Sequence, residues 1–232
     1  MNEEHPRQPI EEAIANGDLR KLLLLSGMLH GHYCLFSALG VKAGALAMRE
    51  MGASSKGMEE LVAIVETNNC FSDGVQIVTG CTFGNNALIF RDYGKTAFTL
   101  CHRDGEGIRV LVLADRVMQR QSQDTNELFE KVIVKRAGTE AEGEQLRSMW
   151  KELSFELLEA PDEEVFEVRK VTADVPAYAS IFASAKCSVC GESVMESRAR
   201  FRGGAPICLA CSDHEFYQLA GNGIVARRRD IP

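Results

Sequence analysis

The sequence predicts a fold that mixes helices and strands in one main domain, followed by a small cysteine-rich domain. Helical and strand-like patterns alternate up to about residue 115, and four of the eight cysteines form two close pairs near the end. The chain has 232 residues, more than one typical domain of ~150 residues and fewer than two full-sized domains need. We therefore expect a core domain over residues 1–180 and a smaller domain over 181–232.

The first part of the chain predicts helices. Apolar residues from Ile10 to Leu25 recur at helical spacing, and Asn16-Gly17-Asp18 divides them into two short helices. The segment LHGHYCLFSALGVKAGALAMREMG predicts a buried helix with several small residues. This helix is expected to start at or just after the HGH triplet and to end near Gly52.

Strand patterns follow. LVAIVET (61–67) predicts a core strand, and CFSDGVQIVTG predicts a short helix after it. Three further strand-like runs cover residues 87–92, 95–103 and 107–114, with Tyr93-Gly94 and Asp104-Gly105 as turns. The result is a helix–strand–helix–three-strand unit. Because no G-x-G-x-x-G follows its first strand, a dinucleotide-binding fold is excluded.

The second half of the core domain carries a charged helical pattern. It runs from Asp124 to Ala160, with expected interruptions at Gly138 and Gly143, and forms a helical extension of about 120–165. Residues 166–176 alternate like a strand. The net charge of −7 is concentrated in residues 140–167, which indicates a solvated helical face.

Composition excludes several classes of protein. The longest apolar runs, such as Leu22–Leu25, are far shorter than the ~18 residues of a membrane span. The start, MNEEHPRQP, lacks the basic-then-apolar order of a secretion signal, so we expect a cytoplasmic protein with reduced thiols. H-E-x-x-H, P-loop and G-x-S-x-G motifs are absent, which gives no support to common hydrolase and kinase chemistries.

Two Cys-x2-Cys pairs predict a zinc ribbon. They are Cys187 with Cys190 and Cys208 with Cys211, and a strand, a Gly203-Gly204 turn and a second strand are expected between them. Four thiolates complete a tetrahedron and leave no position for substrate. We therefore expect a structural zinc ion that supplies much of the stability of this small domain.

Soft ligands also gather in the first half. His30 and His32 precede Cys34, and either residues 30 and 34 share one helix face, or a helix start near 32 lowers the pKa of Cys34. Cys70 follows the first strand and Cys81 follows the next short helix. Cys101, inside an alternating strand, is expected to be a small core residue.

At these motifs the chain resembles the FmdE family, the E-type accessory subunits of the molybdenum and tungsten formylmethanofuran dehydrogenases. The similarity rests on the HGHYC segment, on ETNNCFSDGVQIVTGCTFGNNALIFRDYGKTAFTL and on CSVCGE…CLAC. It implies an α+β core of α-β-α-β-β-β order with a mixed sheet, a C-terminal zinc ribbon and a homodimer. The small-residue helix at 35–48 adds weak support for the homodimer.

The resemblance implies a site in the core domain. Cys34, Cys70, His32 and Asp73 would be its catalytic residues. A second divalent transition metal, such as zinc, nickel, copper or iron, would have the following ligands: His30, His32, Cys34, Cys70 and Cys81. The chain departs from the family at Cys34-Leu35-Phe36, where Cys-Pro-Gly is usual, and at Gly84-Asn85-Asn86-Ala87, where Gly-Lys-Gly-Asn is usual.

Three functions remain open. The first is an enzyme or metal-handling site that uses the His/Cys cluster, and the second is a non-catalytic accessory protein that binds a partner in a redox complex. The third is a zinc-ribbon nucleic-acid binder. It is the least favoured, because its basic footprint is limited to two small patches, Arg198/Arg200/Arg202 and Arg227/Arg228/Arg229.

Overall fold

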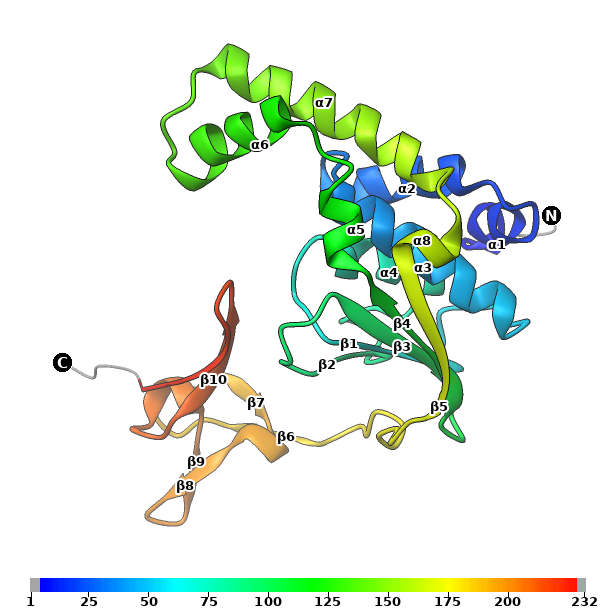
Figure 1. The fold of residues 1–232 in the computed structure, drawn as a ribbon. Helices are drawn as coiled ribbons and strands as arrows, with labels where there is room; N and C mark the ends of the chain where they lie inside the picture. The colour runs from blue at the N-terminus through cyan, green and yellow to red at the C-terminus, as the bar shows by residue number, and fades with distance from the viewer. Residues whose placement is uncertain (1–4, 229–232) are drawn as a thin grey trace. The chain divides into compact units, whose positions relative to one another are not determined.

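The computed structural model describes residues 5–228. The chain divides into two compact units, Met1–Pro176 and Ala177–Pro232 (Figure 1). Each is described separately below. Within the described part of the chain, no helix combines the length and hydropathy that crossing a lipid bilayer requires.

Four helices build the first half of the larger unit. They are α1 (Gln8–Ala15), α2 (Leu19–His30), α3 (Leu35–Glu50) and α4 (Phe71–Thr79). The expected division of residues 10–25 is confirmed, because Asp18 caps α2 by accepting a hydrogen bond from the backbone of Lys21 at 2.9 Å.

A five-stranded sheet forms the other layer. Its strands are β1 (Leu61–Val65), β2 (Leu88–Phe90), β3 (Ala97–His102), β4 (Glu106–Val112) and β5 (Phe166–Thr172). The order in the sheet is β2-β1-β3-β4-β5, with β1 and β2 parallel and the other pairs antiparallel. The expected α+β class and mixed sheet are therefore confirmed.

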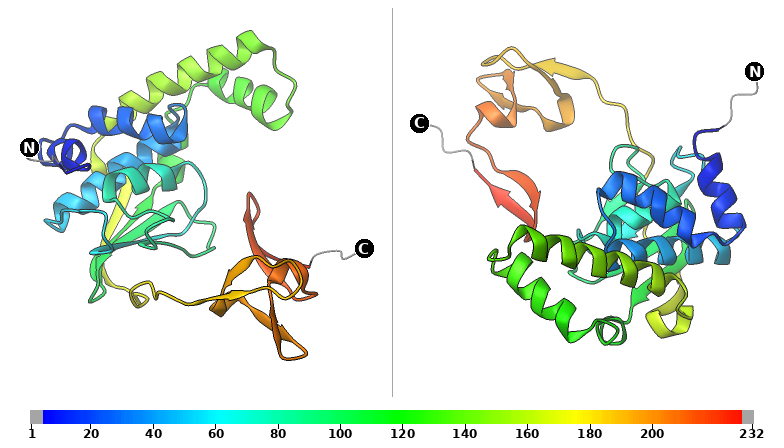
Figure 2. Two further views of the ribbon diagram at one scale, coloured as in Figure 1. Left: turned by 180° about the vertical axis from the view of Figure 1, so that it is seen from behind. Right: turned by 90° about the horizontal axis from the view of Figure 1, so that it is seen from above.

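The two faces of the sheet are covered differently. Leu61, Ala63 and Val65 of β1 point into a core formed with α3 and α4, and the views in Figure 2 show these helices on one face. Val62 and Ile64 point to the opposite face, where they pack with Cys101 and with residues that follow β5. This alternation is the period of two that strands impose.

Glycines allow α3 and α4 to pack very closely. A Cβ atom added at Gly40 would lie 2.0 Å from the carbonyl oxygen of Phe71, and one at Gly74 would lie 2.4 Å from that of Ser37. The small residues of α3 therefore serve a contact inside the unit. Their use as weak support for a homodimer was wrong for this reason.

The helical extension lies between β4 and β5. It contains α5 (Ala114–Met118), α6 (Gln123–Phe129), a π-helical turn (Glu130–Val134), α7 (Glu140–Leu158) and α8 (Asp162–Val165). Thr139 and Glu142 form a capping box at the start of α7. The expected interruption at Gly143 was wrong, because the capped helix passes through it.

The smaller unit is built from three two-stranded sheets. They pair β6 (Ser184–Lys186) with β7 (Ser193–Met195), β8 (Arg200–Arg202) with β9 (Ala205–Ile207), and β10 (Phe216–Ala220) with β11 (Gly223–Arg227). The β8–β9 hairpin turns at Gly203 and Gly204, both with positive φ, as the sequence predicts. The β10–β11 hairpin was not expected.

Candidate functional site

The His/Cys cluster lies where α2 ends and α3 begins. His30 is the last residue of α2, Gly31 ends that helix with a φ of 84°, and Cys34 is the N-cap of α3. The expectation that residues 30 and 34 share one helix face was therefore wrong. They belong to two helices and meet across the connecting turn.

The Cys34 thiol is held by the start of α3. Cys34 is only 6% exposed, and a capping box joins it to Ser37, whose hydroxyl donates to the Cys34 carbonyl oxygen at 3.0 Å. Its Sγ lies 3.7 Å from Nε2 of His30. A helix N-terminus favours a thiolate because its free N–H groups point at the sulfur.

Asp73 orients His30 from the first turn of α4. Oδ2 of Asp73 lies 2.8 Å from Nδ1 of His30, and the amide of Gln76 donates to Oδ1 at 3.1 Å. Burial lowers the pKa of His30, but the bond to Asp73 and the nearby Cys34 outweigh it and raise that pKa above its ordinary value. Asp73 thus aims the other nitrogen, Nε2, at Cys34.

His32 completes a set of three ligand atoms. The donor atoms of His30, His32 and Cys34 all lie within 4.8 Å of one another, and the two imidazole rings are 4.4 Å apart. Zinc–nitrogen bonds of about 2.0 Å and zinc–sulfur bonds of about 2.3 Å place tetrahedral ligand atoms roughly 3.3–3.8 Å apart. The three donors therefore fit one transition metal after small side-chain rotations.

Cys70 adjoins the cluster as the N-cap of α4. A hydrogen bond between the two sulfur atoms is the largest cause that lowers the pKa of Cys34, to about 5, while burial opposes it. The same bond raises the pKa of Cys70. One sulfur is thus a thiolate and the other its thiol donor.

The structure does not bring Cys81 to this cluster. Cys70 precedes α4 and Cys81 follows it, so the nine-residue helix separates them by about 13 Å. Cys81 is buried, and burial raises the pKa of its thiol to about 11. Cys101 is fully buried on β3, where its thiol contacts the Val62 carbonyl oxygen at 3.5 Å.

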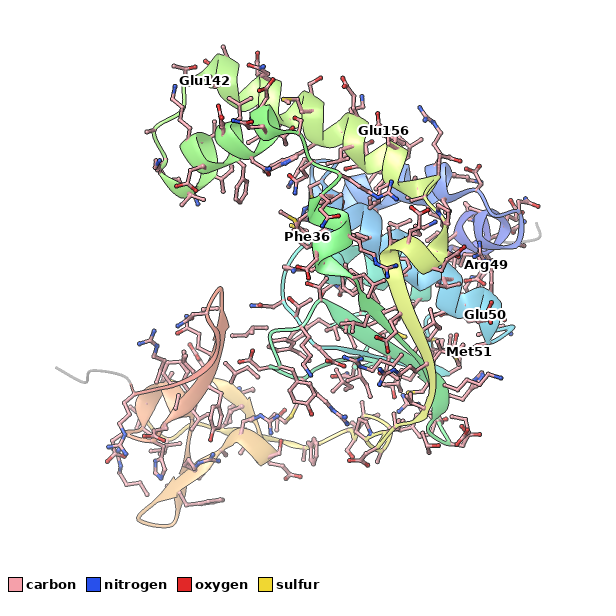
Figure 3. The ribbon with its side chains drawn as sticks, viewed as in Figure 1. Phe36, Arg49, Glu50, Met51, Glu142 and Glu156 are labelled. Atoms are coloured by element: carbon pink, nitrogen blue, oxygen red, sulfur yellow. The ribbon has the colours of Figure 1, made fainter. Side chains whose placement is uncertain are left out.

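A pocket of about 260 Å³ opens beside the cluster. His32, Cys34 and Cys70 form one side of it, together with Phe36, which Figure 3 labels near the start of α3. The other side comes from the helical extension. Its residues there are Met118, Gln121, Asn126, Phe129, Ile133 and Trp150.

Sequence reasoning missed this second wall. The ring of Trp150 lies 6.0 Å from that of Phe129 and 6.4 Å from that of His32. A signal was present, because Leu146, Trp150 and Leu157 recur at helical spacing in an otherwise charged segment. The concentration of acids in this segment indicates only its solvated face.

The smaller unit contains the second cluster. The sulfur atoms of Cys187, Cys190, Cys208 and Cys211 lie within 4.8 Å of one another. The Cys190 and Cys208 sulfur atoms are 3.9 Å apart, close to the roughly 3.8 Å of a tetrahedral four-thiolate zinc site. Backbone N–H groups, chiefly that of Cys190, lower the pKa of Cys187 to about 6. The donor set fits zinc.

The two arginine patches of this unit are partly neutralised. Arg202 lies 3.8 Å from Asp213, and Arg228 lies 3.3 Å from Glu215. Arg229 lies outside the described residues. These ion pairs reduce the positive charge that a phosphate backbone would meet.

Fold and sites together define a mixed α/β metal-binding protein with a four-cysteine zinc finger. Residues 29–167 match the family described as "FmdE, Molybdenum formylmethanofuran dehydrogenase operon", which is more than half of the 232 residues. The chain therefore belongs to the FmdE family. Residues 180–213 match the prokaryotic dksA/traR C4-type zinc finger, which identifies the four-cysteine cluster as a zinc-binding site.

Two relatives show how far the similarity extends. A protein of Archaeoglobus fulgidus, named "Probable S-adenosyl-L-methionine-binding protein", is 42% identical over 220 residues, which is 93% of this chain and 58% of that protein. The chain thus spans little more than half of that relative. The crystal structure of an FmdE-like protein of tungsten formylmethanofuran dehydrogenase from Syntrophus aciditrophicus shares the fold. Its TM-score is 0.54 at 22% identity, over 83% of this chain and 91% of that one.

Proposed function

We propose that the core domain binds a second transition metal through His30, His32 and Cys34, with Cys70 as a further soft ligand. The observation that carries this proposal is the convergence of three donor atoms within 4.8 Å. The bond from Asp73 to the far nitrogen of His30 supports it. Metal-binding histidines typically make such a bond, which fixes the tautomer that leaves Nε2 free.

Each residue has a defined part in this proposal. Asp73 accepts the Nδ1 proton of His30, the start of α3 stabilises the Cys34 thiolate, and Cys70 donates to that thiolate until a metal replaces its proton. A soft divalent metal would supply Lewis-acid chemistry at this position. The pocket lined by His32, Cys34 and Cys70 gives a small molecule access to it.

Elemental analysis tests this proposal. Protein purified without oxygen or chelator should contain two metals per chain, and Cys34→Ser should lose one while the zinc of the smaller unit remains. Cys101→Ala is the matched control and should lose none, because Cys101 is buried on β3 away from both clusters. One metal in the wild type would overturn the proposal.

A metal-free thiolate site is the second candidate. Cys34, His30 and Asp73 form a chain with distances of 3.7 Å and 2.8 Å, in which an imidazolium held by a carboxylate would face a thiolate. Nucleophilic cysteines are activated by this arrangement. Modification of Cys34 by iodoacetamide at neutral pH in protein with one metal would favour it, and an inert Cys34 would exclude it.

A non-catalytic accessory role in a redox complex, in the cytoplasm and as a homodimer, remains a proposal from family membership. It predicts one metal per chain, which separates it from the core-metal proposal. For the homodimer, light scattering at micromolar concentration should give about twice the chain mass of 25.5 kDa. A mass of one chain would contradict it.

A further inference from the structure

The pocket beside the cluster has a chemical character that the cluster itself does not define. Among the described residues that line it, none is Asp, Glu, Lys or Arg. A charged group that entered it would lose its hydration without gaining a counter-charge, which is costly. The part of a ligand that enters this pocket is therefore uncharged.

Its walls favour an aromatic ring. Phe129 is 39% exposed and Met118 is 45% exposed, although both side chains are apolar, and Trp150 stands next to Phe129 at an angle of 54°. Exposed apolar groups gathered around a concavity mark a binding site more than a structural surface. Aromatic faces and a methionine sulfur interact well with the face and edge of another ring.

The remaining lining residues limit the ligand further. Gln121 and Asn126 offer amide groups that can hydrogen-bond to the edge of a heteroaromatic ring. The volume of about 260 Å³ lies just below the usual range of ~300–1,000 Å³ for ligand pockets, so one or two fused rings fill it. Ile133 lines it from a π-helical turn, a feature that is frequent at functional sites.

We infer that this pocket binds an uncharged, flat aromatic or heteroaromatic ring that carries a donor atom toward the His32 and Cys34 cluster. The inference rests on the proposed core metal for the donor atom, and on the walls alone for the ring. The ring packs against Trp150 and Phe129 while its donor reaches the metal position. The helical extension thus selects the substrate class of the site.

The single tryptophan of the chain, Trp150, provides a direct readout. The probe is 4-phenylimidazole, which is neutral at pH 8, titrated into the full chain while tryptophan emission is followed. We expect saturable quenching. The cyclohexyl analogue should bind roughly three- to tenfold more weakly, because it lacks a flat ring. An analogue with a carboxylate on the ring should bind at least about tenfold more weakly.

Variants locate the contact. Phe129→Leu keeps the apolar volume and removes the ring, so it should weaken probe binding roughly three- to tenfold. Phe83→Ala is the matched control, because Phe83 is 80% exposed and does not line the pocket. Circular dichroism verifies that both variants fold. Unchanged affinity in Phe129→Leu, or equal affinity for the flat, cyclohexyl and carboxylate probes, would overturn the inference.

The metal proposal and the ring site can fail separately. Equal probe affinity in wild type and Cys34→Ser, with selectivity for the flat ring intact, would count against the metal and uphold the ring site. Two metals per chain without any response of Trp150 emission would overturn the ring site and leave the metal proposal standing.

Discussion

Single hydrogen bonds decide the chemistry of the cluster at the residue scale. Cys34, Cys81 and Cys101 are all buried, yet only Cys34 caps a helix and receives a proton donor from a second thiol. Burial alone raises the pKa of the other two to about 11. Three buried cysteines thus differ because of the atoms that face them.

The first prediction concerns metal-free protein. After chelation, iodoacetamide should modify Cys34 at pH 6–7, while Cys81 and Cys101 stay unmodified in native protein. The folded pKa of Cys34 is lowered to about 5 from an ordinary value of 9.0, so the thiolate persists above pH 5 and is lost below it. Mass spectrometry of the labelled peptides gives the pH profile. A midpoint near 9 for Cys34 would contradict the lowered pKa.

The same shift links protonation to stability. Because the folded pKa lies below the unfolded one, the thiolate stabilises the folded state fully above pH 9, and this contribution falls until it disappears below about pH 5.

The second prediction concerns Asp73. Asp73→Asn should weaken binding of the core metal roughly 10- to 100-fold, because His30 loses the partner that orients it. Competition with a chromophoric chelator measures this affinity, and the zinc of the smaller unit should be unaffected. As a positioning residue, Asp73 should also affect the pH profile of Cys34 modification. Asp115→Asn, at an exposed position of α5, is the control.

Close packing of α3 and α4 places the cluster at the element scale. Both helices begin at this site, with Cys34 and Cys70 as their N-caps. Gly40 and Gly74 let the two backbones approach so closely that neither position has room for a Cβ. The distance between the two cysteines therefore depends on glycines farther along each helix.

The third prediction tests this packing. Gly40→Ala should destabilise the larger unit by about 1–3 kcal/mol, because its Cβ would meet the backbone oxygen of Phe71, which cannot rotate away. This loss exceeds the helix propensity that alanine gains. Urea unfolding followed by Trp150 emission measures it. Gly84→Ala, with open space around its Cβ, should stay within about 0.5 kcal/mol, and equal stability of both variants would contradict the account.

The two units hold their structures by different means at the scale of the whole molecule. The larger has an extensive apolar core, whereas the core of the smaller consists of Cys187, Ile207 and Cys208 with a few partly buried neighbours. Such a small core cannot offset the entropy of folding, so the zinc site must supply the difference.

The fourth prediction follows from this contrast. Chelation should make residues beyond about 180 sensitive to protease, while a fragment that ends near Pro176 survives. Limited digestion with and without chelator, read by mass spectrometry, tests it. Readdition of zinc should restore resistance. Equal resistance of the whole chain in both conditions would show that the smaller unit does not depend on its metal.

The sequence by itself determined the features that depend on local patterns. Apolar periodicity located the strands of the sheet, Asp18 marked the start of α2, and two Cys-x2-Cys pairs predicted the zinc finger. These signals are readable because the residues that carry them lie within a few positions of one another.

Only the tertiary structure decided which distant residues meet. It separated His30 and Cys34 into two helices, joined His30 to Asp73, and left Cys81 at the far end of α4. It also brought Trp150 to His32, although more than a hundred residues separate them in the chain. Spacing in the sequence cannot give such contacts, because the packing of whole helices and sheets sets the distances between them.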